Sequence, residues 1–103
     1  MKATLSPTAA KELREAADFI ASDNRKAARR FVLTVQDALS TTGEHPDIGA
    51  ERLELAEPPI RFWTVHRYPY LLIYNSRRSP PRVLHILHGA RDLPDLLSNL
   101  RSD

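Results

Sequence analysis

The sequence contains no cysteine, only three glycines and a single tryptophan among its 103 residues. The absence of cysteine excludes disulfides, thiolate metal sites and a cysteine nucleophile, so we expect stability to come from packing alone. No apolar run approaches the roughly 18 residues that a membrane-spanning helix needs, and the first residues lack the long apolar stretch of a secretory signal. We therefore expect a cytoplasmic protein without membrane contacts.

Acidic residues are absent from a long part of the second half of the chain. The formal net charge is only +2, and the length suits a single domain over residues 1–103. Between Pro58 and Arg91, however, there are six arginines and no acid, namely Arg61, Arg67, Arg77, Arg78, Arg82 and Arg91. Such a block favours a nucleic acid, a nucleic-acid-handling machine or an acidic protein tail as partner, and a merely solvated surface explains it equally well.

Two helices are predicted in the first half. Ser6 is suited to cap a helix whose first position is Pro7, and the apolar stripe that follows ends at residues 22–24. A second stripe runs from Arg25 toward Gly43, a glycine that we expect to adopt the left-handed conformation at the helix end. The linker is so short that the two helices should form an antiparallel hairpin.

Strands account for most of the remaining sequence. Residues 2–5 are a short strand candidate and residues 44–59 are interpreted as a loop. Three runs rich in aliphatic and aromatic residues follow at 60–66, 70–75 and 82–88, and their short connections predict an antiparallel meander. The fold class is therefore α+β with the order βααβββ(α), in which the final helix is optional, and the helical hairpin packs on one face of a small antiparallel sheet. We expect the other face of the sheet to be open to a partner.

The final residues carry a leucine stripe, which favours an amphipathic helix. Packing of this helix against the sheet is the preferred interpretation, and a partner-binding face is the alternative. The stripe consists of Leu93, Leu96, Leu97 and Leu100. At its start, Asp92 is expected to cap the helix and Arg91 to pair with a carboxylate of the hairpin.

The order of these elements resembles that of ParE-type toxins in the ParE/RelE superfamily. The resemblance rests on three segments, Arg61–Val65, Tyr70–Tyr74 and Val83–Asp92, and on the turn at residues 45–49, and it covers nearly the whole chain. It implies a toxin of a type II toxin-antitoxin system, with a ParE/RelE-like fold. It also implies a cognate antitoxin that neutralises the toxin by wrapping it, and contact with operator DNA only through that antitoxin.

The superfamily uses one fold for two activities. Members like RelE cut mRNA on the ribosome, whereas members like ParE inhibit DNA gyrase. Cleavage needs a base, an acid and cations around the phosphate, and Arg61, His88 and Arg91 are the candidates here. His85 and His88 are three residues apart on a strand, so they should point to opposite faces, and one of them should be structural. The lysines that RelE-like nucleases tend to carry along the middle strands are missing, since all three lysines of this chain precede these strands.

We therefore predict a ParE-like toxin that binds DNA gyrase, and keep a ribosome-dependent mRNA endonuclease as the alternative. A degenerate toxin retained as antitoxin binder and co-repressor is a third interpretation. The four histidines lack metal-site spacing, so neither metal nor cofactor is expected. The predicted target-binding residues are Arg61, Trp63, Arg77, Arg78, Arg82 and Arg91, with Arg61 on the open face of the sheet. The predicted antitoxin-binding residues are Leu13, Phe31, Val35, Arg61 and Arg82.

Overall fold

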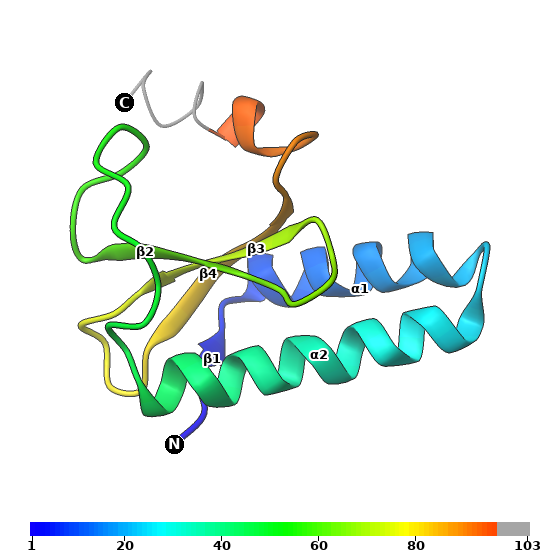
Figure 1. Cartoon of the computed structure of the whole chain (residues 1–103), viewed down its shortest axis with the longest axis horizontal. Coiled ribbons are helices and arrows are strands. Elements are labelled where there is room, and N and C mark those ends of the chain that lie inside the picture. The colour runs from blue at the N-terminus through cyan, green and yellow to red at the C-terminus, as the bar shows by residue number, and fades with distance from the viewer. Residues whose placement is uncertain (97–103) are drawn as a thin grey trace.

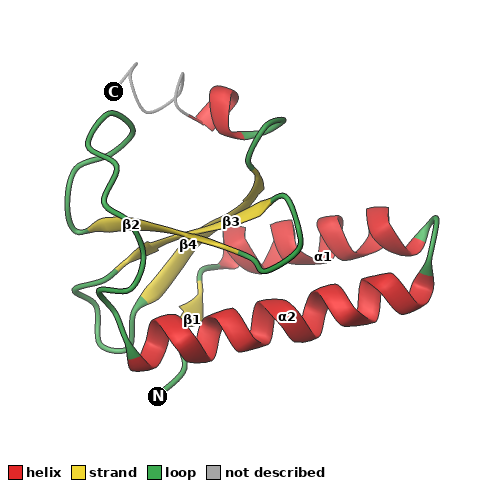
Figure 2. Cartoon of the chain, viewed as in Figure 1, coloured by secondary structure: helices red, strands yellow, loops and turns green. Residues whose placement is uncertain are grey.

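The computed structural model describes residues 1–96, and these form two helices and a four-stranded sheet (Figure 1). In chain order the elements are β1 (Thr4–Leu5), α1 (Pro7–Ala21), α2 (Arg25–Glu44), β2 (Ile60–Thr64), β3 (Tyr70–Asn75) and β4 (Arg82–His88). The two helices run antiparallel along one side of the sheet, and a long loop joins α2 to β2 (Figure 2). The predicted α+β class and order of elements are confirmed. Neither helix of the described residues has the apolar length required to cross a bilayer.

Both helices begin where capping chemistry predicts. The Ser6 side chain accepts a hydrogen bond from the main-chain N–H of Ala9, and that of Asn24 accepts one from Ala27. The end of α2 differs from the prediction, because Gly43 stays helical and has no positive φ. A Cβ at Gly43 would overlap the main chain of Met1, so this glycine allows the N-terminus to approach α2 closely instead of ending the helix.

The sheet has the order β1-β4-β3-β2. Strands β2, β3 and β4 form the predicted antiparallel meander, while β1 pairs in parallel with β4, so the sheet is mixed. Strand β2 ends at Thr64, two residues earlier than expected, because the chain already turns there: the N–H of Tyr68 bonds to the carbonyl of Val65 at 3.1 Å. The other two meander strands have the predicted bounds.

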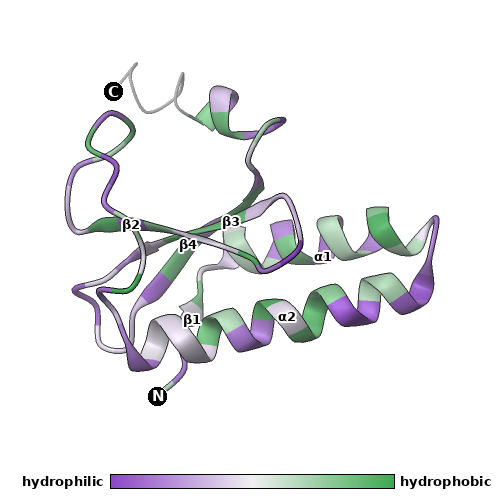
Figure 3. Cartoon of the chain, in the orientation of Figure 1, coloured by the Kyte–Doolittle hydropathy of each residue, from purple (hydrophilic) through white to green (hydrophobic). Residues whose placement is uncertain are grey.

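Apolar residues cover both faces of the sheet. On the helix side, Phe31 and Val35 of α2 pack with buried residues of β3 and β4. On the far side, a second cluster of Phe62, Ile73 and Leu87 is covered by partly buried residues. These are Leu55 and Ala56 of the preceding loop, Ile60 at the start of β2, and Leu93 and Leu96 of the segment after β4. Figure 3 shows apolar residues in the helices on one side of the sheet and in the loop and the segment after β4 on the other.

The expectation of an open far face is therefore wrong in part. Leu93 and Leu96 pack against the sheet, as preferred for the leucine stripe. Leu97 and Leu100, the other members of that stripe, lie outside the described residues.

Candidate functional site

Arg61 is bound to the loop that precedes its strand. It lies opposite Tyr74 on β3 and therefore on the helix side of the sheet, not on the open face. Its guanidinium donates to the carbonyls of Asp47 (3.0 Å) and Gly49 (2.7 Å) and to the carboxylate of Glu51 (3.0 Å). Only 19% of the side chain is exposed. An arginine with this many internal partners holds the loop in place and has little capacity left for a ligand.

Tyr74 binds the same loop from the neighbouring strand. Its hydroxyl donates to the carbonyl of Pro46 at 2.7 Å and accepts from the N–H of Gly49 at 2.9 Å. The side chain is completely buried, and this burial raises the pKa of Tyr74 above its usual value. A Cβ at Gly49 would lie 2.6 Å from the Tyr74 hydroxyl, so the contact requires glycine. Sequence reasoning missed Tyr74, because its partners are 25 and 28 residues away and no local pattern marks them.

At the other end of the sheet, His88, Arg91 and Asp92, all singled out from the sequence, lie close together. The bidentate pair between Arg91 and Asp92 has N–O distances of 2.9 and 3.1 Å. The ion pair lowers the pKa of the Asp92 carboxyl and raises the pKa of Arg91. The Nδ1 atom of His88 accepts from the N–H of Arg91, and the imidazole stands edge-on to the ring of Tyr70. The structure corrects two expectations for this group. The first concerns Arg91, which pairs with the neighbouring Asp92. Its guanidinium lies over the ring of Phe19 on α1 and not beside a carboxylate of the hairpin.

The second correction concerns the Asp92 carboxylate. It accepts from the N–H of His88 at 3.1 Å, so it turns back toward β4 instead of capping the helical turn that follows.

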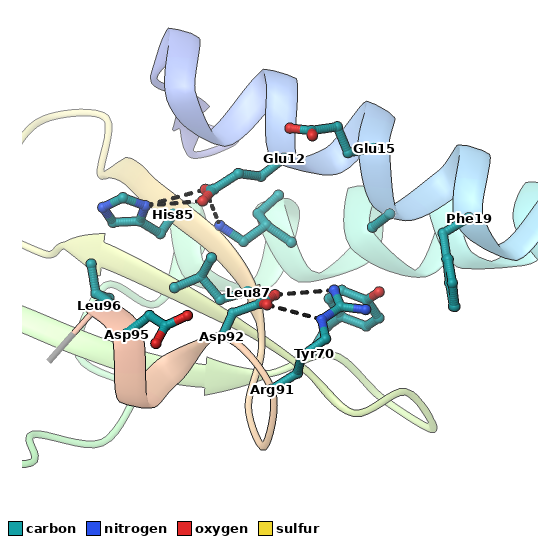
Figure 4. A pocket seen from close by; sticks show the side chains of 12 residues that line it. Glu12, Glu15, Phe19, Tyr70, His85, Leu87, Arg91, Asp92, Asp95 and Leu96 are labelled. Atoms are coloured by element: carbon teal, nitrogen blue, oxygen red, sulfur yellow. Dashed lines mark hydrogen bonds and ion pairs between the residues drawn. The ribbon is translucent and has the colours of Figure 1, made fainter. Parts of the chain in front are cut away.

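A cleft of about 520 Å³ lies between α1 and the outer edge of β4 (Figure 4). The carboxylate of Glu12 lies 3.2 Å from Nδ1 of His85 and accepts the N–H of Ile86 at 3.0 Å, which closes the strand edge beyond β1. Sequence reasoning also missed Glu12, whose partners are 73 and 74 residues away. The titratable lining residues are Glu12, Glu15, Tyr70, His85, Arg91, Asp92 and Asp95. With four carboxylates and one arginine, this cleft repels a phosphodiester.

The candidates for RNA cleavage do not converge. Arg61 pairs with Tyr74 and His88 pairs with Tyr70, so they are four residues apart along β3 and two strand spacings apart across the sheet. With standard strand geometry, Arg61 and His88 are separated by about 13 Å along the strand direction and by about 10 Å across the sheet. The distance between their Cα atoms is therefore about 16 Å. Since the Arg61 guanidinium is bound to the 47–51 loop, the structure brings His88 and Arg91 together and leaves Arg61 apart. Within residues 1–96, no group of three or more metal-ligating side chains is placed to hold a metal ion.

The other predicted target-binding residues occupy different places. Arg77 and Arg78 are exposed in the turn between β3 and β4, and Arg82 is partly buried at the start of β4 beside β1. Trp63 is partly buried and packs against the helix-side core.

The predicted antitoxin-binding residues of the hairpin are mostly internal. Phe31 and Val35 have no exposed surface, so in this structure they offer no contact to a partner. Leu13 is partly buried at the border of the same core. The apolar surface that α1 and α2 do present lies in the groove between them on their solvent side, lined by Ala17, Asp18, Ala21, Arg25, Ala28, Arg29, Val32 and Leu33.

Comparison with known proteins agrees with this architecture. A solved structure titled "Chromosomal ParDE TA system from P. aeruginosa" has the same fold, with a TM-score of 0.69 at 19% sequence identity over 85% of this chain and 95% of that chain. No curated protein matches the sequence. A family model described as the ParE toxin of the type II toxin-antitoxin system, parDE, matches residues 3–93. Since that match covers most of the chain, the protein belongs to the ParE toxin family of type II toxin-antitoxin systems.

Proposed function

We propose that this ParE-family protein acts in the cytoplasm by binding and inhibiting DNA gyrase without cutting nucleic acid, and that a cognate antitoxin neutralises it. One observation carries the choice between binding and cutting: Arg61 is held about 16 Å from His88 at the backbone, as estimated from strand spacings. Acid–base cleavage of RNA needs these groups within hydrogen-bond reach of one phosphate. The proposal of gyrase as the target rests on membership of the ParE family.

The charges around His88 also disfavour cleavage. Arg91 is already paired with Asp92, and the adjacent cleft carries the carboxylates of Glu12, Glu15 and Asp95. A phosphodiester placed beside His88 would therefore meet more negative than positive charge. The mRNA endonuclease has no observation in its favour and serves here as the alternative outcome of the test.

The target surface is best sought where arginines are exposed. Arg77 and Arg78 meet this condition, and Arg82 lies close to them at the start of β4. Exposed guanidinium groups are effective in steering association with an acidic partner surface. We assign to Arg61 and Trp63 the supporting task of shaping the sheet behind this surface, because both side chains pack internally.

The target is tested with purified components. The protein is added to gyrase and relaxed plasmid, and separately to a translating ribosome extract with a defined mRNA. We expect loss of supercoiling with intact mRNA, and cuts in the mRNA at ribosome-positioned codons would overturn the proposal. Arg77→Gln with Arg78→Gln should weaken inhibition by about tenfold, as expected for loss of two interface arginines. The control pair Lys11→Gln with Arg14→Gln removes the same charge from exposed positions on α1 and should leave inhibition unchanged.

For the antitoxin we propose the groove between α1 and α2. It measures about 560 Å³, and Leu33 at its border is 60% exposed. Arg25 and Arg29 stand on its rim, and Asp18 is its one acid. An apolar groove with a cationic rim fits an amphipathic, acidic helix or strand of the antitoxin. We propose this surface for antitoxin binding in place of Phe31 and Val35, which are completely buried in the core.

A pair of leucine substitutions tests this surface. Leu33→Asp introduces a carboxylate into the groove, whereas Leu53→Asp introduces one at a leucine that is 69% exposed in the loop before β2. Each variant is titrated with the product of the neighbouring antitoxin gene in a calorimeter. We expect at least a tenfold weaker Kd for Leu33→Asp, by burial of an unpaired charge, and an unchanged Kd for Leu53→Asp. Equal affinities of the two variants would exclude the groove.

A further inference from the structure

Four cations cover the solvent side of the first two turns of α2. Arg25, Lys26, Arg29 and Arg30 are all exposed, and among the described residues none of them lies within 4 Å of a carboxylate. This arrangement is unfavourable for the isolated chain. Cations near a helix N-terminus oppose the helix dipole, and the two pairs of like charge spaced four residues apart repel each other. No acid in the first turn of α2 offsets this charge.

One side of this cationic face borders a cleft of about 440 Å³ between α2 and the turn that joins β2 to β3. Arg30, Leu33 and Thr34 line it from the helix, and His66, Arg67 and Tyr68 line it from the turn. The lining contains two guanidinium groups, an imidazole and a phenol hydroxyl, and no carboxylate. The cleft therefore gathers hydrogen-bond donors and positive charge without an internal counter-ion.

The backbone of the turn gives a second, independent observation. Arg67 has a φ of 68°, the one positive φ among the described non-glycine residues. A residue in this position of a tight turn is usually glycine, because a Cβ is strained in the left-handed region. Here the position carries a long cationic side chain that lines the same cleft as Arg30. Backbone strain retained at a charged residue points to a role for its side chain.

We propose that this cleft binds the phosphate groups of a nucleic-acid backbone. The planar guanidinium groups of Arg30 and Arg67 match the geometry of a phosphate, and Lys26 lies one helical turn before Arg30 to contact the next one. An acidic peptide is a poorer occupant, because Leu33 is the only aliphatic side chain in the lining and little apolar surface could be buried. Contacts of this kind read the backbone and not the bases, so binding is independent of sequence. The cleft adjoins the proposed antitoxin groove and shares Leu33 with it, but its phosphate-binding residues Arg30 and Arg67 do not line that groove. The assignment does not depend on the proposed gyrase or antitoxin surface.

Fluorescence anisotropy with a labelled 20-base-pair DNA duplex, and with an RNA duplex of the same sequence, tests the site directly. The double variant Arg30→Gln with Arg67→Gly should weaken the Kd for both duplexes at least tenfold at 50 mM salt. The slope of log Kd against log salt should fall by about 1.8, which corresponds to two lost phosphate contacts. Lys11→Gln with Arg14→Gln removes the same charge from α1 and should change the Kd less than twofold. Because Arg67→Gly relieves the strained φ, the melting temperature of the double variant should not fall. A weaker Kd at an unchanged melting temperature then reports the loss of binding and not a loss of folding.

Three results would overturn the assignment. Equal weakening by the cleft variants and the α1 variants would reduce the effect to net charge. Displacement of the duplex by polyglutamate at equal charge concentration would indicate a site for carboxylates instead of phosphates. A more than tenfold preference for DNA or for RNA would contradict a site for the backbone that both share.

Discussion

The hydroxyl of Tyr74 offers the sharpest test of how the sheet holds the 46–51 loop. Tyr74→Phe keeps the buried ring and removes only the oxygen that bonds to Gly49 and Pro46. The buried N–H of Gly49 and the partly buried carbonyl of Pro46 then lose their partner, and an unpaired buried group costs about 1–3 kcal/mol. We expect a loss of about 2–3 kcal/mol in the free energy of unfolding, which at roughly 4–8 °C per kcal/mol for a domain of this size corresponds to about 8–24 °C in Tm.

The same substitution has a signature at alkaline pH. Burial raises the pKa of Tyr74 in the folded protein above the value of about 10 in the unfolded chain. Above pH 10 the folded protein keeps a proton that the unfolded chain has released, so the stabilisation present below pH 10 is lost as the pH rises through the folded pKa. Tyr74→Phe lacks this group, and its stability should therefore decline less steeply above pH 10 than that of the unsubstituted protein.

Urea unfolding followed by the fluorescence of Trp63, the single tryptophan, measures both effects between pH 7 and 11. Tyr68→Phe is the matched control, because Tyr68 is only partly buried. It should change the free energy of unfolding by less than about 0.5 kcal/mol, as is usual away from buried polar partners. A loss below 0.5 kcal/mol for Tyr74→Phe, or an unchanged alkaline slope, would refute the role assigned to its hydroxyl.

Three further substitutions probe the scaffold. Gly43→Ala should lower the free energy of unfolding in urea by about 2 kcal/mol, because the added Cβ meets the main chain of Met1. This loss is expected although alanine favours helices more than glycine does, and a more stable variant would contradict the packing. Asp92→Asn should flatten the acid side of the stability curve below about pH 4, because the lowered pKa of Asp92 gives stabilisation that is lost as pH falls through the folded value; an unchanged acid limb would show that the ion pair is unimportant. Glu12→Ala should cost about 1–3 kcal/mol by leaving a main-chain N–H of β4 unpaired, against less than about 0.5 kcal/mol for the exposed Glu15→Ala, both by thermal melting.

The parts of the fold that could be predicted from the sequence are those specified locally. Ser6 and Asn24 each cap a helix through a bond three residues away, and the apolar stripes give the helical period. The strands 70–75 and 82–88 are bounded by turn residues, and their predicted limits are confirmed.

What could not be predicted depends on pairings between distant segments. The parallel contact of β1 with β4 leaves no period or turn signal in either strand. The role of Gly43 depends on its close approach to the main chain of the N-terminal residues, and the sequence around this glycine gives no sign of that approach. The side of the sheet on which Arg61 lies could not be predicted, because alternation along β2 indicates which residues share a face but not which face the helices cover.

The site residues divide in the same way. Arg77 and Arg78 sit in a turn and are exposed, as a turn signal implies. Phe31 and Val35 lie on the apolar stripe of α2, and a stripe marks equally well a core face and a binding face. The cleft of Arg30 and Arg67 joins a helix to a turn more than 30 residues later, so only the assembled structure brings its two arginines together.

The pairing of the first strand with the last has a consequence during synthesis. Ser6 bonds to Leu84 across a separation of 78 residues. At about 5–20 residues per second, a ribosome needs about 4–16 s to make the chain between them. During that interval the helical hairpin can form, but β1 has no neighbouring strand, so the sheet is completed only after β4 has been synthesised.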